Sequence, residues 1–170
     1  MKFGLYISTQ WPEGADISSE MDNMLEQVRV ARDNGFSSVW MGQHYLVAPM
    51  QMMQVMPLLS RLAAEGEGMT FGTAVILLSM LNPAVVAEEA ATLDWITEGN
   101  FILGVGMGYR KEEFETLGVP FNQRVGRLEE GIDVIRRLWT EDRVNHDGKY
   151  FKIDNLGISL KPKRPGGPPI

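Results

Sequence analysis

The sequence predicts an α/β fold, namely the first four strand–helix units of a TIM (β/α)8 barrel, or a half barrel. Short apolar segments alternate with segments of helical spacing along the 170 residues, which is typical of βαβ units around a parallel sheet. A complete barrel takes about 250 residues. We therefore expect residues 1–170 to form the N-terminal half of a single barrel domain. A doubly wound open sheet is the alternative that fits the same alternation.

The first two units begin with short apolar segments at residues 3–8 and 38–42, which we expect to be buried strands. Residues 17–34 carry apolar side chains at helical spacing, and Gly35 stands where a helix C-terminal glycine is expected. A shorter helix is expected over residues 56–65.

The third unit contains the most continuously apolar segment of the chain, residues 70–78, which we expect to be a strand. Asn82 and Pro83 predict the start of the next helix, because asparagine caps well and proline at the first helical position sacrifices no hydrogen bond. This helix is expected to run to about Thr97, and Gly99 ends it.

The fourth unit is expected to contain a strand over residues 101–105, a short helix over 111–116 and a long helix over 123–140. Apolar side chains recur along the long helix and predict one buried face; they are Val125, Leu128, Ile132, Ile135 and Leu138. Trp139 lies beside this face and is expected to pack against it.

The last part of the chain favours the barrel over the open sheet. An excursion hairpin is expected at about residues 143–154, with Asp147 and Gly148 at its turn. Residues 162–170 are rich in proline and glycine, and we expect them to lead into a fifth strand.

Composition argues against several classes of function. With 16 basic against 22 acidic residues the net charge is −6, so nucleic acid is not an expected partner. The chain has no cysteine, and His44 and His146 are far apart in the sequence, so no metal site is expected. We expect neither a signal peptide nor a membrane-crossing segment, and hence a cytoplasmic protein without a membrane partner. His146, in the hairpin, is expected to face solvent.

Active-site groups of a barrel come from the carboxyl ends of its strands and from the loops that follow. Here the residues after the four expected strands offer aromatic rings, amides, an imidazole and bare backbone. This mixture suits a flat, partly polar cofactor better than a phosphate group or a metal. The expected substrate-pocket residues are Gln10, Trp11, Gln43, Tyr45, Ser79, Asn82 and Tyr109.

His44 is the main catalytic candidate, because imidazole exchanges protons near neutral pH. The alternative, a rim histidine that only hydrogen-bonds its neighbours, stays open. The glycine-rich turn at Gly104, Gly106 and Gly108 does not fit a dinucleotide-binding motif, because the third glycine of that motif would fall on Tyr109. We expect these glycines to let a planar ring approach the backbone; a tight turn is the alternative.

Several longer segments carry a resemblance to a known family. The sequence at residues 35–44, GFSSVWMGQH, resembles the second-strand segment of the bacterial luciferase-like monooxygenases. Residues 72–83 with 87–94 are similar to that family's third strand and following helix, and residues 101–106 with stretches of 113–121 to its fourth unit. The resemblance extends in the right order over essentially all 170 residues.

The family consists of barrel enzymes that use reduced FMN with oxygen, or a deazaflavin coenzyme without it. The resemblance places His44 on the histidine that faces the flavin reaction centre and assists proton transfer. It places Ala74 and Val75 on a third-strand bulge, where several members carry a non-proline cis peptide against the flavin ring. The cofactor-binding residues that it implies are Thr73, Ala74, Val75, Gly106, Met107 and Gly108.

Three positions depart from the family pattern. Gln43 stands where members often have an acidic residue, and Met107 where bacterial luciferase has an arginine, so light emission is not implied. The deazaflavin-dependent sugar-phosphate dehydrogenases have a catalytic acid near the position of Tyr109. Its absence argues against that reaction but not against a deazaflavin cofactor.

The resemblance thus implies a flavin-dependent oxidoreductase. We expect a two-component monooxygenase that takes reduced FMN from a separate flavin reductase and oxidises a small organic substrate with oxygen. The alternatives are deazaflavin-dependent hydride transfer and a non-catalytic truncated half barrel. At full length the protein is expected to be a homo-oligomer. The 170 residues alone are expected to be inactive and to bind flavin weakly, because the cofactor phosphate of a barrel usually binds after strands seven and eight. They are also expected to self-associate through their open sheet edges.

Overall fold

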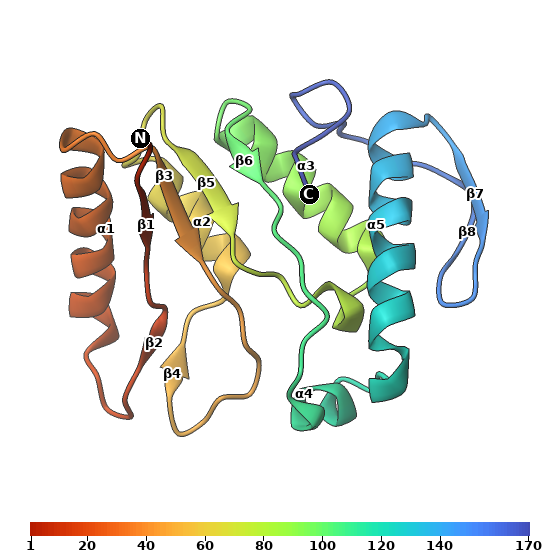
Figure 1. Ribbon diagram of the computed structural model, residues 1–170, viewed down its shortest axis with the longest axis horizontal. Coiled ribbons are helices and arrows are strands. Elements are labelled where there is room, and N and C mark those ends of the chain that lie inside the picture. The colour runs from red at the N-terminus through yellow and green to blue at the C-terminus, as the bar shows by residue number, and fades with distance from the viewer.

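The computed structural model describes residues 1–170 and contains a four-stranded parallel sheet in the order β1-β3-β5-β6. Its strands are β1 (Gly4–Tyr6), β3 (Ser38–Met41), β5 (Thr70–Thr73) and β6 (Phe101–Ile102). The connecting helices are α1 (Ile17–Asp33), α2 (Val55–Ala63), α3 (Pro83–Ile96), α4 (Lys111–Thr116) and α5 (Arg124–Thr140). In Figure 1, α2 and α3 lie behind the sheet, with α1 and α5 at its two sides.

The order of the strands decides between the two predicted architectures. Leu5 pairs with Val39, Val39 with Phe71, and Phe71 with Phe101, so each new strand is added to the same edge of the sheet. A doubly wound sheet reverses direction at a switch point, whereas a barrel does not. The predicted half barrel is therefore confirmed.

The helices bury the faces that the sequence predicts, with one exception. Helix α1 buries Met24, Leu25, Val28 and Ala31, and α5 buries Val134, Ile135, Leu138 and Trp139. Val125 was expected on the buried face of α5, but its side chain is 49% exposed. It lies in the first turn of α5, and the packing of this helix onto the core begins only at Leu128.

Three strands end two or more residues earlier than their apolar sequences predict. Strand β1 stops at Tyr6, although it was expected to reach residue 8, and β5 stops at Thr73 and β6 at Ile102, although apolar residues continue to 78 and 105. After β5 the Ala74–Val75 peptide bond is cis, and the chain then makes one isolated bridge from Ile76 to Val105 before the 3-10 helix η1 (Leu78–Met80). An apolar run indicates burial, and residues 76–80 are buried without continuing the regular ladder.

A short antiparallel pair, β2 (Gln10–Trp11) with β4 (Gln51–Met52), lies beyond the carboxyl ends of the parallel strands. Gln10 pairs with Met52. Each strand has two residues, which is too short for any alternating pattern to be visible in the sequence. This pair brings Gln10 and Met52 to the end of the sheet where a barrel site is expected.

The predicted hairpin forms from β7 (Val144–Asp147) and β8 (Lys152–Leu156), and it is fastened to α5. His146 does not face solvent as predicted: its side chain is 12% exposed, and its Nε2 lies 3.1 Å from Glu130 Oε1. The prediction was wrong because a carboxylate of α5 reaches into the hairpin. The backbone N–H groups of Tyr150 and Phe151 also donate to Glu130 Oε1, at 3.1 and 2.8 Å.

Replacing Glu130 with alanine should loosen this hairpin. Burial alone would raise the pKa of Glu130, but hydrogen bonds from Phe151, His146 and Tyr150 outweigh it and hold the pKa below 4.5. The carboxylate therefore stabilises the hairpin above pH 4.5, and this stabilisation is lost as the pH falls through the lowered value. Hydrogen bonds to a charged group contribute about 1.5–3 kcal/mol, so the Tyr150 and Phe151 amides should exchange roughly 10- to 100-fold faster in Glu130→Ala.

Amide hydrogen exchange measured by NMR at neutral pH checks this prediction. Glu129→Ala is the matched control, because Glu129 neighbours Glu130 on α5 and is exposed. Equal protection of the two amides in both variants would contradict the role of Glu130.

The tail at residues 162–170 runs back along the sheet edge and α3. The backbone N–H of Leu103, just after β6, donates to Pro169 O at 2.9 Å, so the tail lies beside the outer edge of β6. The Asp94 carboxylate, which is fully buried in α3, accepts from the backbone N–H and Nε of Arg164 at 2.8 and 2.9 Å. Trp95 Nε1 donates to Lys161 O at 2.8 Å.

Candidate active site

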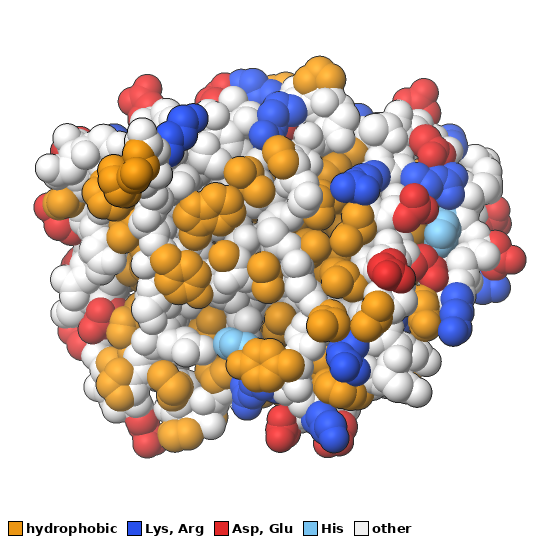
Figure 2. Space-filling model, viewed as in Figure 1, with side chains coloured by type: hydrophobic (Ala, Val, Ile, Leu, Met, Phe, Trp, Pro, Cys, Tyr) orange, Lys and Arg blue, Asp and Glu red, His pale blue; other side chains and the backbone are white.

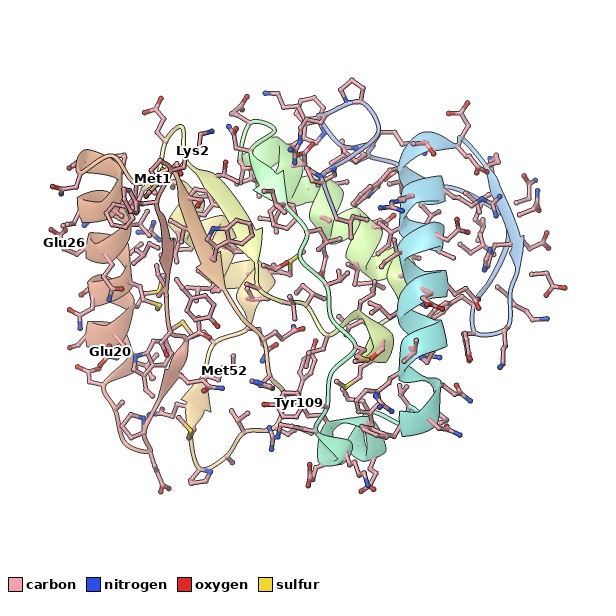
Figure 3. All side chains as sticks on the ribbon, in the orientation of Figure 1. Met1, Lys2, Glu20, Glu26, Met52 and Tyr109 are labelled. Atoms are coloured by element: carbon pink, nitrogen blue, oxygen red, sulfur yellow. The ribbon has the colours of Figure 1, made fainter.

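A cavity of about 340 Å³ opens at the carboxyl ends of β1, β3 and β5. Small-molecule sites in proteins typically have volumes of about 300–1,000 Å³, and the sites of barrels lie at the carboxyl ends of the strands. Its walls come from the segments after each strand; they are Tyr6, Ser8, Thr9, Gln10, Gly42, Gln43, His44, Met52, Ala74, Val75, Leu77, Gly108 and Tyr109. Figure 3 shows two of them, Met52 and Tyr109, at the lower end of the sheet.

His44 lies three residues beyond β3, and its imidazole forms part of the cavity wall. Its side chain is 26% exposed, and its Nδ1 lies 3.2 Å from Glu113 Oε1. The ring of Tyr109 stands nearly perpendicular to the imidazole, at 84° with 5.8 Å between ring centroids. No protein group hydrogen-bonds His44 Nε2, so this nitrogen can serve a ligand in the cavity.

Glu113 is a site residue that the sequence did not single out. It sits in the first turn of α4, where an acidic residue ordinarily signals favourable charge at a helix start. Here the carboxylate is 1% exposed, and Oε1 also accepts from the backbone N–H of Tyr45 at 2.8 Å. Arg110 Nη1 lies 3.6 Å from the same oxygen. The available signal was its neighbour Phe114, which is fully buried and pulls this face of α4 inward.

Gln43 forms the wall between this cavity and a second one. Its Oε1 accepts from Leu77 N at 3.1 Å, and its Nε2 donates to Tyr45 Oη at 2.9 Å and to Gln54 Oε1 at 3.2 Å. The amide is 7% exposed and fully engaged by the protein. Gln43 therefore holds the β3 and β5 loops together beside His44, and an acidic residue at this position would lack the amide hydrogens donated to Tyr45 and Gln54.

The structure brings about half of the predicted site residues into the His44 cavity. Those that line it are Gln10, Gln43, His44, Ala74, Val75, Gly108 and Tyr109. Tyr45 and Asn82 line the second cavity instead, a space of about 450 Å³ between α2 and α3 that also meets Glu89. These two residues therefore lie outside the lining of the His44 cavity, and Tyr45 Oη accepts from Gln43 Nε2 in the wall that the two cavities share. Their contact with a substrate stays a prediction.

The remaining predicted site residues have roles inside the protein. Trp11 is 8% exposed and belongs to the hydrophobic core, not the pocket. Ser79 is completely buried, and its Oγ donates to Met107 O at 2.7 Å, which links η1 to the loop after β6. The Met107 side chain is 44% exposed and does not line the cavity. Thr73 is 1% exposed and its Oγ1 donates to Gly104 O at 2.7 Å.

The glycines after β6 make close approaches to the protein itself. A Cβ on Gly104 would lie 2.0 Å from Thr73 O, and one on Gly106 would lie 2.7 Å from Val75 Cγ2. Gly108 has a φ of +71° and lines the cavity. Packing explains the first two glycines, and Gly106 thereby lets the Val75 side chain reach its place in the cavity wall. Their contact with a cofactor ring stays a prediction.

The residues around the cavity fit a flat, partly polar cofactor. Val75, which is 36% exposed, and Leu77 offer apolar surface, whereas Gln10 and His44 offer polar groups. A Cβ on Gly42 would lie 2.7 Å from Tyr6 Oη and 3.0 Å from Ala74 O, so this glycine lets the Tyr6 side chain and the backbone of Ala74 come close to β3. Figure 2 shows hydrophobic side chains gathered across the middle of this face of the molecule.

The fold and this site define the first half of a (β/α)8 barrel, with parallel strands in chain order and a histidine at their carboxyl ends. The whole sequence, residues 1–170, matches the model of the luciferase-like monooxygenase family. The chain belongs to that family.

The relatives include an F420-dependent dehydrogenase and a monooxygenase. An F420-dependent glucose-6-phosphate dehydrogenase of Amycolatopsis mediterranei is 32% identical over 87% of this chain and 49% of its own length. A 4-hydroxyprotoasukamycin monooxygenase of Streptomyces nodosus subsp. asukaensis is 29% identical over 100% of this chain and 46% of its own. The chain thus spans about half the length of these curated relatives. Family members are oxidoreductases, including monooxygenases.

A solved structure shows the same fold. The monooxygenase RslO1 from Streptomyces bottropensis superposes on 99% of this chain with a TM-score of 0.87 and 23% identity, and 52% of that protein is covered.

None of the helices here combines the length and the apolar character that crossing a lipid bilayer requires.

Proposed function

We propose that the chain provides the catalytic half of a flavin-dependent, two-component monooxygenase that acts on a small organic substrate. The observation that carries the proposal is His44, whose Nδ1 is held by a buried carboxylate and whose Nε2 is left for the cavity. The 29% identity to a monooxygenase supports the reaction class. Activity, substrate and partners of the whole protein belong to this proposal.

Six residues of the cavity wall have a role in this proposal. Ala74, Val75 and Gly108 hold the flat ring of FMN, and Gln10 binds polar atoms at its edge. Bound reduced FMN supplies the electrons with which oxygen is activated. His44 Nε2 holds or moves a proton beside the ring. Tyr109 lies edge-on to the imidazole in the cavity wall and limits the access of water.

The partners follow from the chemistry. A monooxygenase that consumes reduced FMN needs a separate flavin reductase, and we propose such a partner together with oxygen and the organic substrate. A homo-oligomer at full length and a cytoplasmic location are part of the same proposal.

A second candidate is deazaflavin-dependent hydride transfer. The 32% identity to an F420-dependent dehydrogenase favours it. The same cavity surfaces would hold the deazaflavin ring. His44 would then exchange a proton with the substrate carbonyl or hydroxyl, and the reaction would not use oxygen. A non-catalytic half barrel is the third candidate.

Cofactor titration separates these candidates. FMN and F420 are titrated, by their fluorescence, into the 170-residue chain and into a full-length barrel that contains it. We expect the full-length barrel to bind FMN at least about tenfold more tightly than F420, a difference of about 1.4 kcal/mol. We expect the chain alone to bind weakly, because the phosphate loops of a barrel follow strands seven and eight. Preference for F420 would favour hydride transfer, and binding of neither cofactor would favour the non-catalytic half barrel.

A further inference from the structure

Glu113 contacts His44, and favourable charge at the start of a helix does not explain these contacts. Three groups converge on its Oε1: the backbone N–H of Tyr45 at 2.8 Å, His44 Nδ1 at 3.2 Å and Arg110 Nη1 at 3.6 Å. Its Oε2 is buried, and no donor of the protein reaches it. One carboxylate oxygen is thus shared between the backbone and the imidazole.

An ionised carboxylate only accepts hydrogen bonds. When His44 is neutral, the hydrogen bond to Oε1 therefore requires the hydrogen on Nδ1, and the lone pair then lies on Nε2. Since no protein group bonds Nε2 and the imidazole lines the cavity, the basic nitrogen faces the ligand space. Arg110 Nη1, a hydrogen-bond donor, lies 3.6 Å from the same oxygen.

We propose that Glu113 is a positioning residue that fixes His44 in the Nδ1–H tautomer and so presents Nε2 to the cavity as a proton acceptor. The carboxylate acts through the imidazole and does not itself line the cavity. The tautomer follows from the contacts alone, whereas its consequence for turnover rests on the proposed function.

The other histidine provides a built-in control, since the chain contains only two. His146 makes the opposite arrangement: its Nε2 lies 3.1 Å from Glu130 Oε1, and its Nδ1 lies 3.5 Å from the Arg137 Nη1 donor. His146 should therefore be the Nε2–H tautomer. One spectrum of the neutral protein should show one histidine of each kind.

Long-range ¹H–¹⁵N spectra of the ¹⁵N-histidine-labelled 170-residue chain, recorded at alkaline pH, test this directly. We expect His44 as Nδ1–H and His146 as Nε2–H. In Glu113→Gln the amide oxygen still accepts, so His44 should keep its tautomer. In Glu113→Leu the acceptor is gone, so His44 should lose the Nδ1–H form while His146 stays unchanged and reports an intact fold.

Two outcomes overturn the proposal: wild-type His44 as the Nε2–H tautomer, or Glu113→Leu with an unchanged His44 and a native His146. If Glu113→Leu does not fold, the wild-type spectrum alone decides. In the full-length enzyme Glu113→Leu should lower kcat by roughly 10- to 100-fold, as for other groups that orient a functional imidazole, with KM little changed. If the tautomer is as expected and His44→Ala keeps full turnover, the proposed function fails while the assignment to Glu113 stands.

Discussion

The His44→Ala variant of the full-length enzyme should lose about 10²- to 10⁴-fold in substrate oxidation while its affinity for FMN changes little. General acid–base catalysis by a placed side chain contributes a factor of this size. The affinity should persist because most of the cavity surface offered to the ring comes from other residues, among them Ala74, Val75 and Gly108.

Stopped-flow turnover with flavin titration measures both quantities. His146→Gln is the matched control, because it removes the other histidine, which lies in the hairpin outside the cavity. Its turnover should equal that of the wild type. Full turnover in His44→Ala would remove the proton-handling role, and an equal loss of turnover in both variants would point to general destabilisation.

The Arg164→Ala variant should lose about 3–5 kcal/mol of unfolding free energy. Asp94 is fully buried, and Arg164 donates to it from the backbone N–H, from Nε and from Nη2. Arg164 Nη2 also donates to Phe101 O on β6. Removing one partner of a buried pair leaves the other charge without compensation, which costs an amount of this order. The tail would then be released from α3 and from the sheet edge.

Urea unfolding followed by tryptophan fluorescence measures the loss. Lys163→Ala is the control, because the adjacent Lys163 pairs with Glu98, whose side chain is 74% exposed, and exposed pairs contribute about 0–1 kcal/mol. Asp94→Asn combined with Arg164→Ala should be more stable than Arg164→Ala alone, since the uncompensated charge is gone. Equal stability of the Arg164 and Lys163 variants would refute the anchoring role of Asp94.

The fold could be predicted because the apolar pattern and the helix signals agree. Asn82 and Pro83 begin α3 as predicted, with Asn82 Oδ1 accepting from Ala84 N at 2.9 Å. The ends of the strands could not be predicted, since Ile76 and Leu78 are as buried as strand residues but lie outside the regular ladder. The β2–β4 pair depends on contacts far apart in the sequence, which no local pattern reports.

The candidate site was predictable in position but not in its internal connections. His44 follows a strand, so its place at the carboxyl end could be deduced from topology. Whether a side chain after a strand points into the cavity depends on the loop that carries it, and so the sequence did not show that Tyr45 and Ser79 lie outside the lining of the His44 cavity. Glu113 reaches His44 from 69 residues away, and its sequence context is that of an ordinary acidic helix start.

A crystal structure of the full-length protein with FMN bound tests the central claim most directly. The flat ring should occupy the cavity between Val75, Gly108 and Gln10, with His44 Nε2 directed at it and Nδ1 on Glu113. A ring seated in the other cavity beside Asn82, or a His44 imidazole turned away from the ring, would contradict the assignment of this site.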